Sequence, residues 1–187
     1  MLRPFHVNEV YLATQGEGLF VGVPTIFIRF QGCSLHCSYC DSLYSVPFGE
    51  KAAAIGEGQY LELPQLIEKI REVNTPHTTH FCLTGGEPLQ VQRAAFDTLI
   101  WKLLADFGAR IVIETGGHIP TNTLLEGANR YPSSVHLCVD YKLPSSGMTG
   151  RMRSEAFSSL RPTDSIKYVC ADESDYQAAK THLSSLS

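Results

Sequence analysis

The sequence contains no apolar run approaching the roughly 20 residues that a membrane-spanning helix needs. Its first residues, MLRPFHVNEVYLATQGEG, also lack the apolar centre of a secretory signal. Positive charge is scarce, because 15 Lys and Arg stand against 19 Asp and Glu, which gives a formal net charge of −4. Binding driven by neutralisation of nucleic-acid phosphates is therefore not expected. These absences predict a cytoplasmic protein with no membrane and no nucleic-acid partner.

Low-complexity runs are absent too, and 43% of the 187 residues are hydrophobic. A chain of this length can bury about two thirds of its unfolded surface in one core. We therefore expect a single domain over residues 1–187.

A fourth cysteine is missing from the stretch QGCSLHCSYCD, residues 31–41, which holds Cys33, Cys37 and Cys40. In a reducing compartment, cysteines this close together are thiols or metal ligands rather than disulfides. The other cysteines stand singly in apolar runs and are expected to be small buried side chains: Cys82, Cys138 and Cys170.

Apolar and β-branched segments alternate with segments of helical spacing, which predicts repeated β-α units and a parallel sheet. The expected strands are TIFIRF (25–30), HFCLT (80–84), ARIVIET (109–115), VHLCV (135–139) and SIKYVC (165–170). The expected helices are PQLIEKIREV (64–73), residues 92–107 up to a stop at Gly108, a short stretch near 121–129, and one that begins around Asp172.

Parallel α/β sheets bind ligands at the carboxyl ends of their strands. The loops that follow the first four expected strands should therefore meet at one rim. They carry the cysteine stretch, TGGEP (84–88), ETGG (114–117) and DYK (140–142).

Three thiolates without a fourth suit an iron–sulfur cubane in which one iron is left open for a small ligand. A zinc site completed by His36 or a remote histidine is the alternative. His36 directly precedes Cys37, so the two would have difficulty reaching one tetrahedral ion together, and a second C-x2-C is absent.

The C-x3-C-x2-C spacing, with Tyr39 before the last cysteine and GGEP after the next buried strand, resembles the radical S-adenosylmethionine superfamily. TQGEG (14–18), GVPTIFIRFQGC (22–33), IETGG (113–117), KLPSSGM (142–148) and SIKYV (165–169) are similar in order and interval to the 7-carboxy-7-deazaguanine synthase family. This resemblance covers nearly the whole chain. It implies an incomplete (β/α)6-type partial barrel with a parallel sheet, abbreviated at the C-terminus.

The resemblance implies a carbon–nitrogen lyase of queuosine and 7-deazapurine biosynthesis. A [4Fe-4S] cluster held by Cys33, Cys37 and Cys40 would bind S-adenosylmethionine at its open iron and cleave it to a 5′-deoxyadenosyl radical. That radical would take hydrogen from C6 of 6-carboxy-5,6,7,8-tetrahydropterin, and ring contraction with loss of ammonia would give 7-carboxy-7-deazaguanine. An electron donor such as flavodoxin or ferredoxin, and a homodimer, are further family expectations.

The residues that bind the substrate in the family correspond here to the TQGEG motif (14–18) and to the ends of two expected strands, at Arg29 and Thr84. Arg29 would pair with the substrate carboxylate through its planar fork and, with Glu17, is the candidate catalytic residue. The remaining candidates around the pterin are Thr14, Gln15, Gly16 and Thr84.

The cofactor residues implied by the resemblance surround the cysteine stretch and the loops beyond it. Magnesium would take the Ser42 hydroxyl, in an Asp41-Ser42 pair that would otherwise be an ordinary turn. The candidates for S-adenosylmethionine are Tyr39, Cys40, Asp41, Gly86, Glu87, Glu114, Thr115, Asp140, Tyr141 and Lys142.

Two departures from the family pattern stand out. Relatives often have Ser-Pro-Lys where this chain has Asp140-Tyr141-Lys142, and they usually continue beyond the helix at 172–186 with a segment that contacts the substrate. Three explanations for the early end stay open: an abbreviated barrel, closure of the pocket by a partner or another segment, or an incomplete chain.

Two other functions remain as alternatives. A glycyl-radical activase could share the cysteine stretch and GGEP, but it would not need TQGEG and Arg29. An electron-carrying or structural iron–sulfur module would normally supply a fourth cysteine and would not need Glu114 or Lys142 at the same rim.

Overall fold

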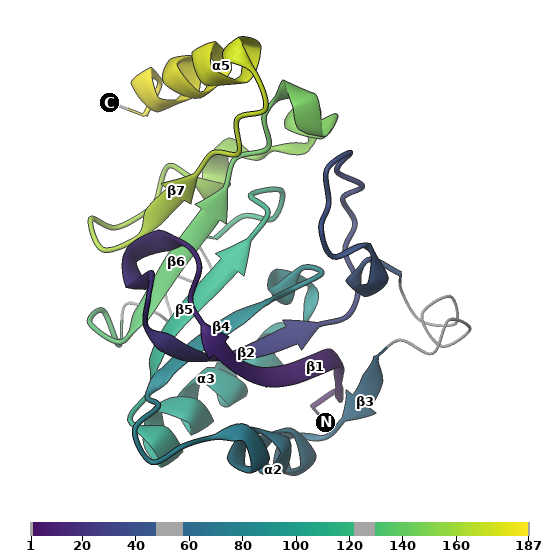
Figure 1. Cartoon of the computed structure of the whole chain (residues 1–187), viewed down its shortest axis with the longest axis vertical. Helices are drawn as coiled ribbons and strands as arrows, with labels where there is room; N and C mark the ends of the chain where they lie inside the picture. Colours follow the sequence, from purple (N-terminus) through teal and green to yellow (C-terminus); the bar gives the residue numbers. More distant parts are fainter. Residues whose placement is uncertain (1, 48–57, 122–129, 187) are drawn as a thin grey trace.

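The computed structural model describes residues 2–47, 58–121 and 130–186. Its framework is a seven-stranded sheet in the order β3-β1-β2-β4-β5-β6-β7 (Figure 1). The strands are β1 (Phe5–Thr14), β2 (Pro24–Phe30), β3 (Gln59–Leu61), β4 (His80–Gly85), β5 (Arg110–Thr115), β6 (Val135–Asp140) and β7 (Ser165–Lys167). The α-helices are α2 (Leu63–Val73), α3 (Arg93–Phe107) and α5 (Glu173–Ser184). Short 3-10 turns are η1 (Gly18–Phe20), η2 (Leu43–Ser45), η3 (Pro88–Gln90), η4 (Pro144–Ser146), η5 (Thr149–Arg151) and η6 (Ser154–Ala156).

The parallel sheet predicted from the sequence is confirmed for β2, β4, β5, β6 and β7. β6 is buried along its whole length, as expected for a strand covered on both faces. β7 is shorter than predicted and ends at Lys167 rather than Cys170. Among the described residues no helix is long and apolar enough to cross a membrane.

Two strands were missing from the prediction. β1 pairs antiparallel with both β2 and β3, so the sheet is mixed at this edge. The signal in the sequence is the alternation in FHV, where Phe5 and Val7 are buried and His6 lies between them. A register shift between Val7 and Glu9 breaks that alternation, which explains why it is weak over the whole strand.

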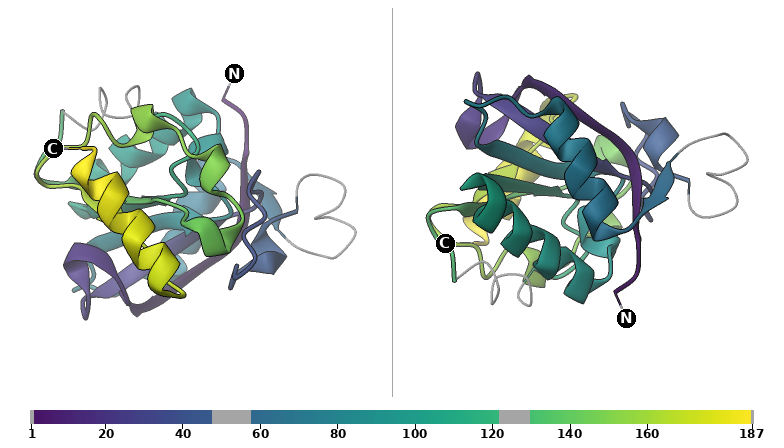
Figure 2. Two further views of the ribbon diagram at one scale, coloured as in Figure 1. Left: turned by 90° about the horizontal axis from the view of Figure 1, so that it is seen from above. Right: turned by 90° about the horizontal axis from the view of Figure 1, so that it is seen from below.

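The predicted helices α2 and α3 are confirmed and pack on one face of the sheet, whereas α5 lies at the opposite end, beyond β7 (Figures 1 and 2). α2 starts with Pro64 in its first turn and a reciprocal pair of bonds between Glu62 and Gln65. α3 ends at Gly108, which adopts the left-handed conformation at φ 57°. Asp172 caps α5 by accepting a hydrogen bond from Asp175 N.

One expectation about the cysteines is wrong. Cys82 and Cys138 are buried, but Cys170 is exposed, because β7 stops before it and the chain turns toward α5. The helical stretch expected near 121–129 falls largely on residues 122–129, which lie outside the described residues.

Substitutions on α3 test whether its apolar face forms part of the hydrophobic core. We expect Leu99→Ala to lower the free energy of unfolding by about 2–5 kcal/mol, because Leu99 is fully buried and its removal leaves a cavity. Trp101→Ala on the same helix should change it by only about 0.5 kcal/mol, since Trp101 is 56% exposed. Urea unfolding of both variants measures the difference, and equal losses would place the core elsewhere.

Candidate functional site

The predicted convergence of loops is confirmed by a cavity of about 330 Å³ at the carboxyl ends of the parallel strands. A cavity of this size lies within the range of small-molecule sites. The parallel register creates it: Arg29 at the end of β2 pairs with Thr84 on β4. At the other edge, Asp140 on β6 pairs with Lys167 on β7.

The cysteine stretch, residues 31–41, is fixed by backbone hydrogen bonds to three neighbouring segments. Gly32 N donates to Ser45 O at 2.7 Å, and Cys33 N donates to Val46 O at 3.0 Å. Gly32 O in turn accepts from Glu87 N at 2.8 Å. The far end of the stretch is held by Ser38, whose amide and hydroxyl donate to the carbonyls of the loop at 144–147. All three cysteines line the cavity.

The GGEP turn approaches the cysteine stretch so closely that glycine is required. A Cβ at Gly86 would overlap the Gly32 carbonyl, and Gly85 has φ 115°, which side chains rarely adopt. Glu87 is buried beneath this turn. Its carboxylate accepts from Thr115 Oγ1 at 2.7 Å and from Gly116 N at 2.9 Å. Burial raises the pKa of Glu87, although these hydrogen bonds oppose the rise.

Glu114 joins residues that the sequence assigned to two different ligands. One oxygen accepts from Thr84 Oγ1 at 2.9 Å and the other from Gln15 Nε2 at 3.1 Å. Gln15 and Thr84 were predicted to meet the substrate, whereas Glu114 was predicted to meet S-adenosylmethionine. The three side chains form one polar network, with Thr84 and Glu114 on the cavity wall and Gln15 behind them.

Arg29 enters the cavity with its guanidinium already oriented. Its Nε donates to Glu9 Oε1 at 2.7 Å and its Nη2 to Tyr11 Oη at 2.9 Å. Tyr44, from the turn after the cysteines, also donates to Glu9 Oε1. Burial by itself would lower the pKa of Arg29, but the Glu9 hydrogen bond and the tyrosines outweigh it and raise the pKa. Arg29 is therefore a permanent cation in the cavity.

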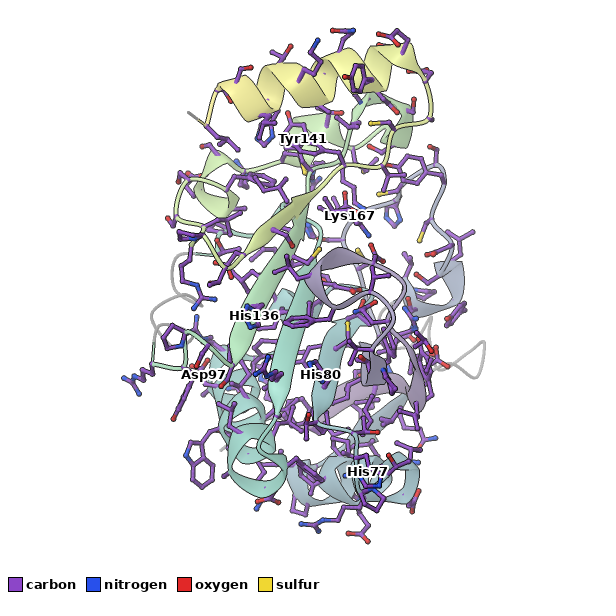
Figure 3. All side chains as sticks on the ribbon, turned by 60° about the vertical axis from the view of Figure 1, so that its left-hand side comes forward. His77, His80, Asp97, His136, Tyr141 and Lys167 are labelled. Atoms are coloured by element: carbon purple, nitrogen blue, oxygen red, sulfur yellow. The ribbon has the colours of Figure 1, made fainter. Side chains whose placement is uncertain are left out.

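A cluster of charged side chains lies across the cavity from Arg29. Lys142 Nζ and Lys167 Nζ approach Asp140 Oδ2 at 2.7 and 3.5 Å. Lys167, labelled in Figure 3, also pairs with Glu17 Oε2 at 2.6 Å, which joins β7 to the loop after β1. Burial would lower the pKa of each lysine, but the nearby carboxylates raise both.

Lys167 was not among the residues predicted for the site. It lies within the SIKYV motif, at the end of the fifth parallel strand, whereas the predicted rim consisted of the loops after the first four. The signal was available, because the last parallel strand ends at the same rim. The other lining residues that the prediction missed are Phe27, Leu35, Val46, Gly85, Gly116, Cys138 and Val169.

Most predicted site residues meet in the cavity, but some lie outside its lining. Gln15 and Glu87 lie behind it and act through Glu114 and Thr115, as described above. Tyr141 points away, beneath α5, where its ring stacks on His182 with centroids 3.6 Å apart (Figure 3). The predicted residues outside the lining are Thr14, Gln15, Gly16, Gly86, Glu87 and Tyr141.

Comparisons with known proteins assign the chain to a family. The family model described as the Radical SAM superfamily matches residues 27–141. The 7-carboxy-7-deazaguanine synthases of Methanospirillum hungatei and Koribacter versatilis are 35% and 34% identical, each over 93% of this chain. That of Leptospira interrogans is 32% identical over 91% of this chain. The chain belongs to the 7-carboxy-7-deazaguanine synthase family.

The family assignment agrees with a solved structure. The crystal structure of QueE from Escherichia coli superposes with a TM-score of 0.73 and 26% identity, over 98% of this chain and 79% of that one. This confirms the radical S-adenosylmethionine fold. The chain spans 64%, 68% and 73% of the length of the three synthases named above.

The cavity fits the [4Fe-4S] cluster and S-adenosylmethionine that membership in this superfamily implies. Cys33, Cys37 and Cys40 supply three thiols around one space. Two lining residues also carry buried polar atoms that have no hydrogen-bond partner in the described part of the chain, Tyr39 Oη and Asp140 Oδ1. Such atoms are rare in folded proteins and are suited to bind a polar ligand.

Burial favours the protonated form of two of the three thiols when the cluster is absent. Burial raises the pKa of Cys33 to about 11 and also raises the pKa of Cys37. Iron binds the thiolate, so loading the cluster must release these protons.

We therefore expect cluster loading to depend on pH. Anaerobic reconstitution with iron and sulfide should be several-fold faster at pH 9 than at pH 7, because a larger fraction of Cys33 and Cys37 is ionised. The rate of cluster loading is measured as iron bound per chain and as the brown absorbance of the cluster. Cys33→Ala should abolish the colour, whereas Cys170→Ser, which changes an exposed cysteine, should not alter it. A pH-independent loading rate would contradict the role of thiol ionisation.

Proposed function

We propose that this chain converts 6-carboxy-5,6,7,8-tetrahydropterin to 7-carboxy-7-deazaguanine with loss of ammonia, as a step of queuosine or 7-deazapurine biosynthesis. The observation that carries the proposal is that Arg29 and the three thiols line one cavity. An arginine in such a place can hold a carboxylate close to a cluster-bound cofactor. The relatives of similar sequence are 7-carboxy-7-deazaguanine synthases.

The residues of this chain would bind, orient and shield the reactants. The cluster and S-adenosylmethionine, when bound, supply the radical chemistry. Cys33, Cys37 and Cys40 would hold the cluster, and Lys142 would face the carboxylate of S-adenosylmethionine. Tyr39 supplies the unpartnered hydroxyl beside them.

The opposite half of the cavity would hold the pterin. Its carboxylate would meet Arg29, whose fork is held by Glu9 and Tyr11. The amide-like edge of the ring offers donors and acceptors that the network of Glu114, Thr84 and Gln15 can match. Glu17 is held by Lys167, which fixes the loop after β1 over the substrate side.

The reaction itself is the test of this proposal. Reconstituted protein incubated with reductant, S-adenosylmethionine, magnesium and 6-carboxytetrahydropterin should form 7-carboxy-7-deazaguanine, detected by mass spectrometry. Cleavage of S-adenosylmethionine without that product would keep the superfamily and reject the substrate. A flavodoxin or ferredoxin donor and a homodimer are parts of the proposal that need their own measurements.

Arg29 is expected to act through its fork rather than through charge alone. Arg29→Ala should lower kcat/KM for the pterin by about 100-fold, because a charge-assisted, bidentate interaction is lost. Arg29→Lys should recover only part of it. Steady-state product formation measures both, with Arg93→Ala as the control, since Arg93 lies on α3 and pairs with Asp97. An unchanged kcat/KM in Arg29→Ala would remove Arg29 from substrate binding.

Magnesium is proposed to bind the Ser42 hydroxyl together with substrate oxygens. In this structure Ser42 Oγ lies at 3.1 Å from Asp41 Oδ1, at the rim of the cavity. Ser42→Ala should raise the magnesium concentration needed for half-maximal activity about tenfold, and Ser42→Thr should restore it. A titration of product formation against magnesium measures this, and identical curves for Ser42→Ala and the unaltered chain would exclude the assignment.

A further inference from the structure

His118 lies where three of the site loops meet and has no role in the functions described so far. It follows the ETGG motif directly and its side chain is 4% exposed. Its Nε2 lies 2.9 Å from Ser34 Oγ, between Cys33 and Leu35 in the cysteine stretch. Its Nδ1 faces Glu87 Oε2 at 3.6 Å.

The Ser34–His118 contact joins two loops that lack another direct hydrogen bond among the described residues. The cysteine stretch and the GGEP turn are tied by backbone bonds, such as Glu87 N to Gly32 O. The ETGG loop is tied to the GGEP turn through Glu87, which accepts from Gly116 N. Within the described residues, the imidazole of His118 alone extends this network from the ETGG loop to the cysteine stretch.

The imidazole is neutral, which decides how it can bond. Burial lowers the pKa of His118 to about 4, and nearby Arg151 contributes to the lowering. A neutral imidazole has one N–H donor and one acceptor nitrogen. In the tautomer with the proton on Nδ1, which faces the Glu87 carboxylate, Nε2 accepts the hydrogen of the Ser34 hydroxyl; in the other tautomer Nε2 donates to Ser34 Oγ.

Nδ1 is a buried nitrogen without a hydrogen-bond partner among the described residues. Its distance to Glu87 is beyond hydrogen-bond range. A buried polar atom left in this state is uncommon. A movement of less than about 1 Å would bring it within hydrogen-bond range of Glu87.

We propose that His118 is a positioning residue of the iron–sulfur site, which holds Ser34, and with it the Cys33 end of the cysteine stretch, in fixed relation to Glu87 and the GGEP turn. The proposal rests on the cluster and S-adenosylmethionine of the proposed function. The cysteine stretch would hold the cluster, and Gly86 and Glu87 of the GGEP turn would hold S-adenosylmethionine beside it, so binding of both depends on the separation of these two segments. The partners of a ligand-bearing segment commonly matter nearly as much as the ligands.

Four variants separate this role from a general contribution to packing. His118→Leu removes both ring nitrogens, and Ser34→Ala removes only the hydroxyl. His118→Gln places an amide near the position of Nε2 and can still reach Ser34, whereas His118→Asn places one near Nδ1 and reaches only toward Glu87. His77→Gln is the control, because His77 is exposed at the opposite end of the molecule (Figure 3).

The measurements are made on cluster-loaded protein without the pterin. We expect His118→Leu and Ser34→Ala each to shorten the half-life of the cluster under an anaerobic chelator about fivefold. Both variants should also weaken S-adenosylmethionine binding about tenfold. This binding is measured from the change that S-adenosylmethionine causes in the electron paramagnetic resonance spectrum of the reduced cluster. His118→Gln should restore most of the cluster half-life and of the S-adenosylmethionine affinity, and His118→Asn should not. The double variant, Ser34→Ala with His118→Leu, should lose no more of either quantity than each single variant does.

Several outcomes would overturn the proposal. They are unchanged cluster retention in Ser34→Ala, additive losses in the double variant, or equal rescue by glutamine and asparagine. Ser34→Ala keeps the test decisive if His118→Leu fails to fold, which the melting temperature of the apoprotein would reveal. A chain that binds cluster and S-adenosylmethionine but makes no deazaguanine would reject the substrate assignment and leave this test intact. A chain that binds no cluster at all would reject both.

Discussion

The parallel register of β2, β4, β5 and β6 is the constraint on which the site depends. It brings the loop after each strand to one edge of the sheet, so segments more than 100 residues apart in sequence line one cavity. The same strands are buried on both faces in their middle, as the patterns of β4 and β6 show. The polar groups of the site therefore gather at the carboxyl ends of the strands and in the loops that follow them.

Two carboxylates, the buried Glu87 and the half-buried Glu114, connect the loops to one another. Glu87 joins the GGEP turn to the ETGG loop, and Glu114 joins β5 to Thr84 and to the loop after β1. A buried carboxylate without partners would be costly, so each of these networks stabilises one arrangement of several loops at once. The same feature that satisfies the charge also defines the shape of the cavity.

Charge is distributed asymmetrically around this cavity. Arg29 lies on one side with Glu9 and two tyrosines, and Lys142 and Lys167 lie on the other around Asp140. In both regions the cations are paired with carboxylates, Arg29 with Glu9 and the two lysines with Asp140 and Glu17, so the charge is fixed in place on each side. The overall negative charge of the chain gives no sign of this arrangement, because it results from which strand ends are neighbours.

The sequence by itself determined the elements with strong periodicity and the motifs that supply chemistry: α2, α3, the parallel strands, the cysteines and the GGEP turn. It did not reveal β1 and β3 or the exposure of Cys170, because the alternation in β1 is interrupted and β7 ends early. Only the tertiary structure decided that Tyr141 packs under α5, that Lys167 reaches Glu17, and that His118 meets Ser34. Spacing along the chain fixes which residues follow each strand, but the direction of a side chain and its partner across the rim depend on the packing of the whole sheet.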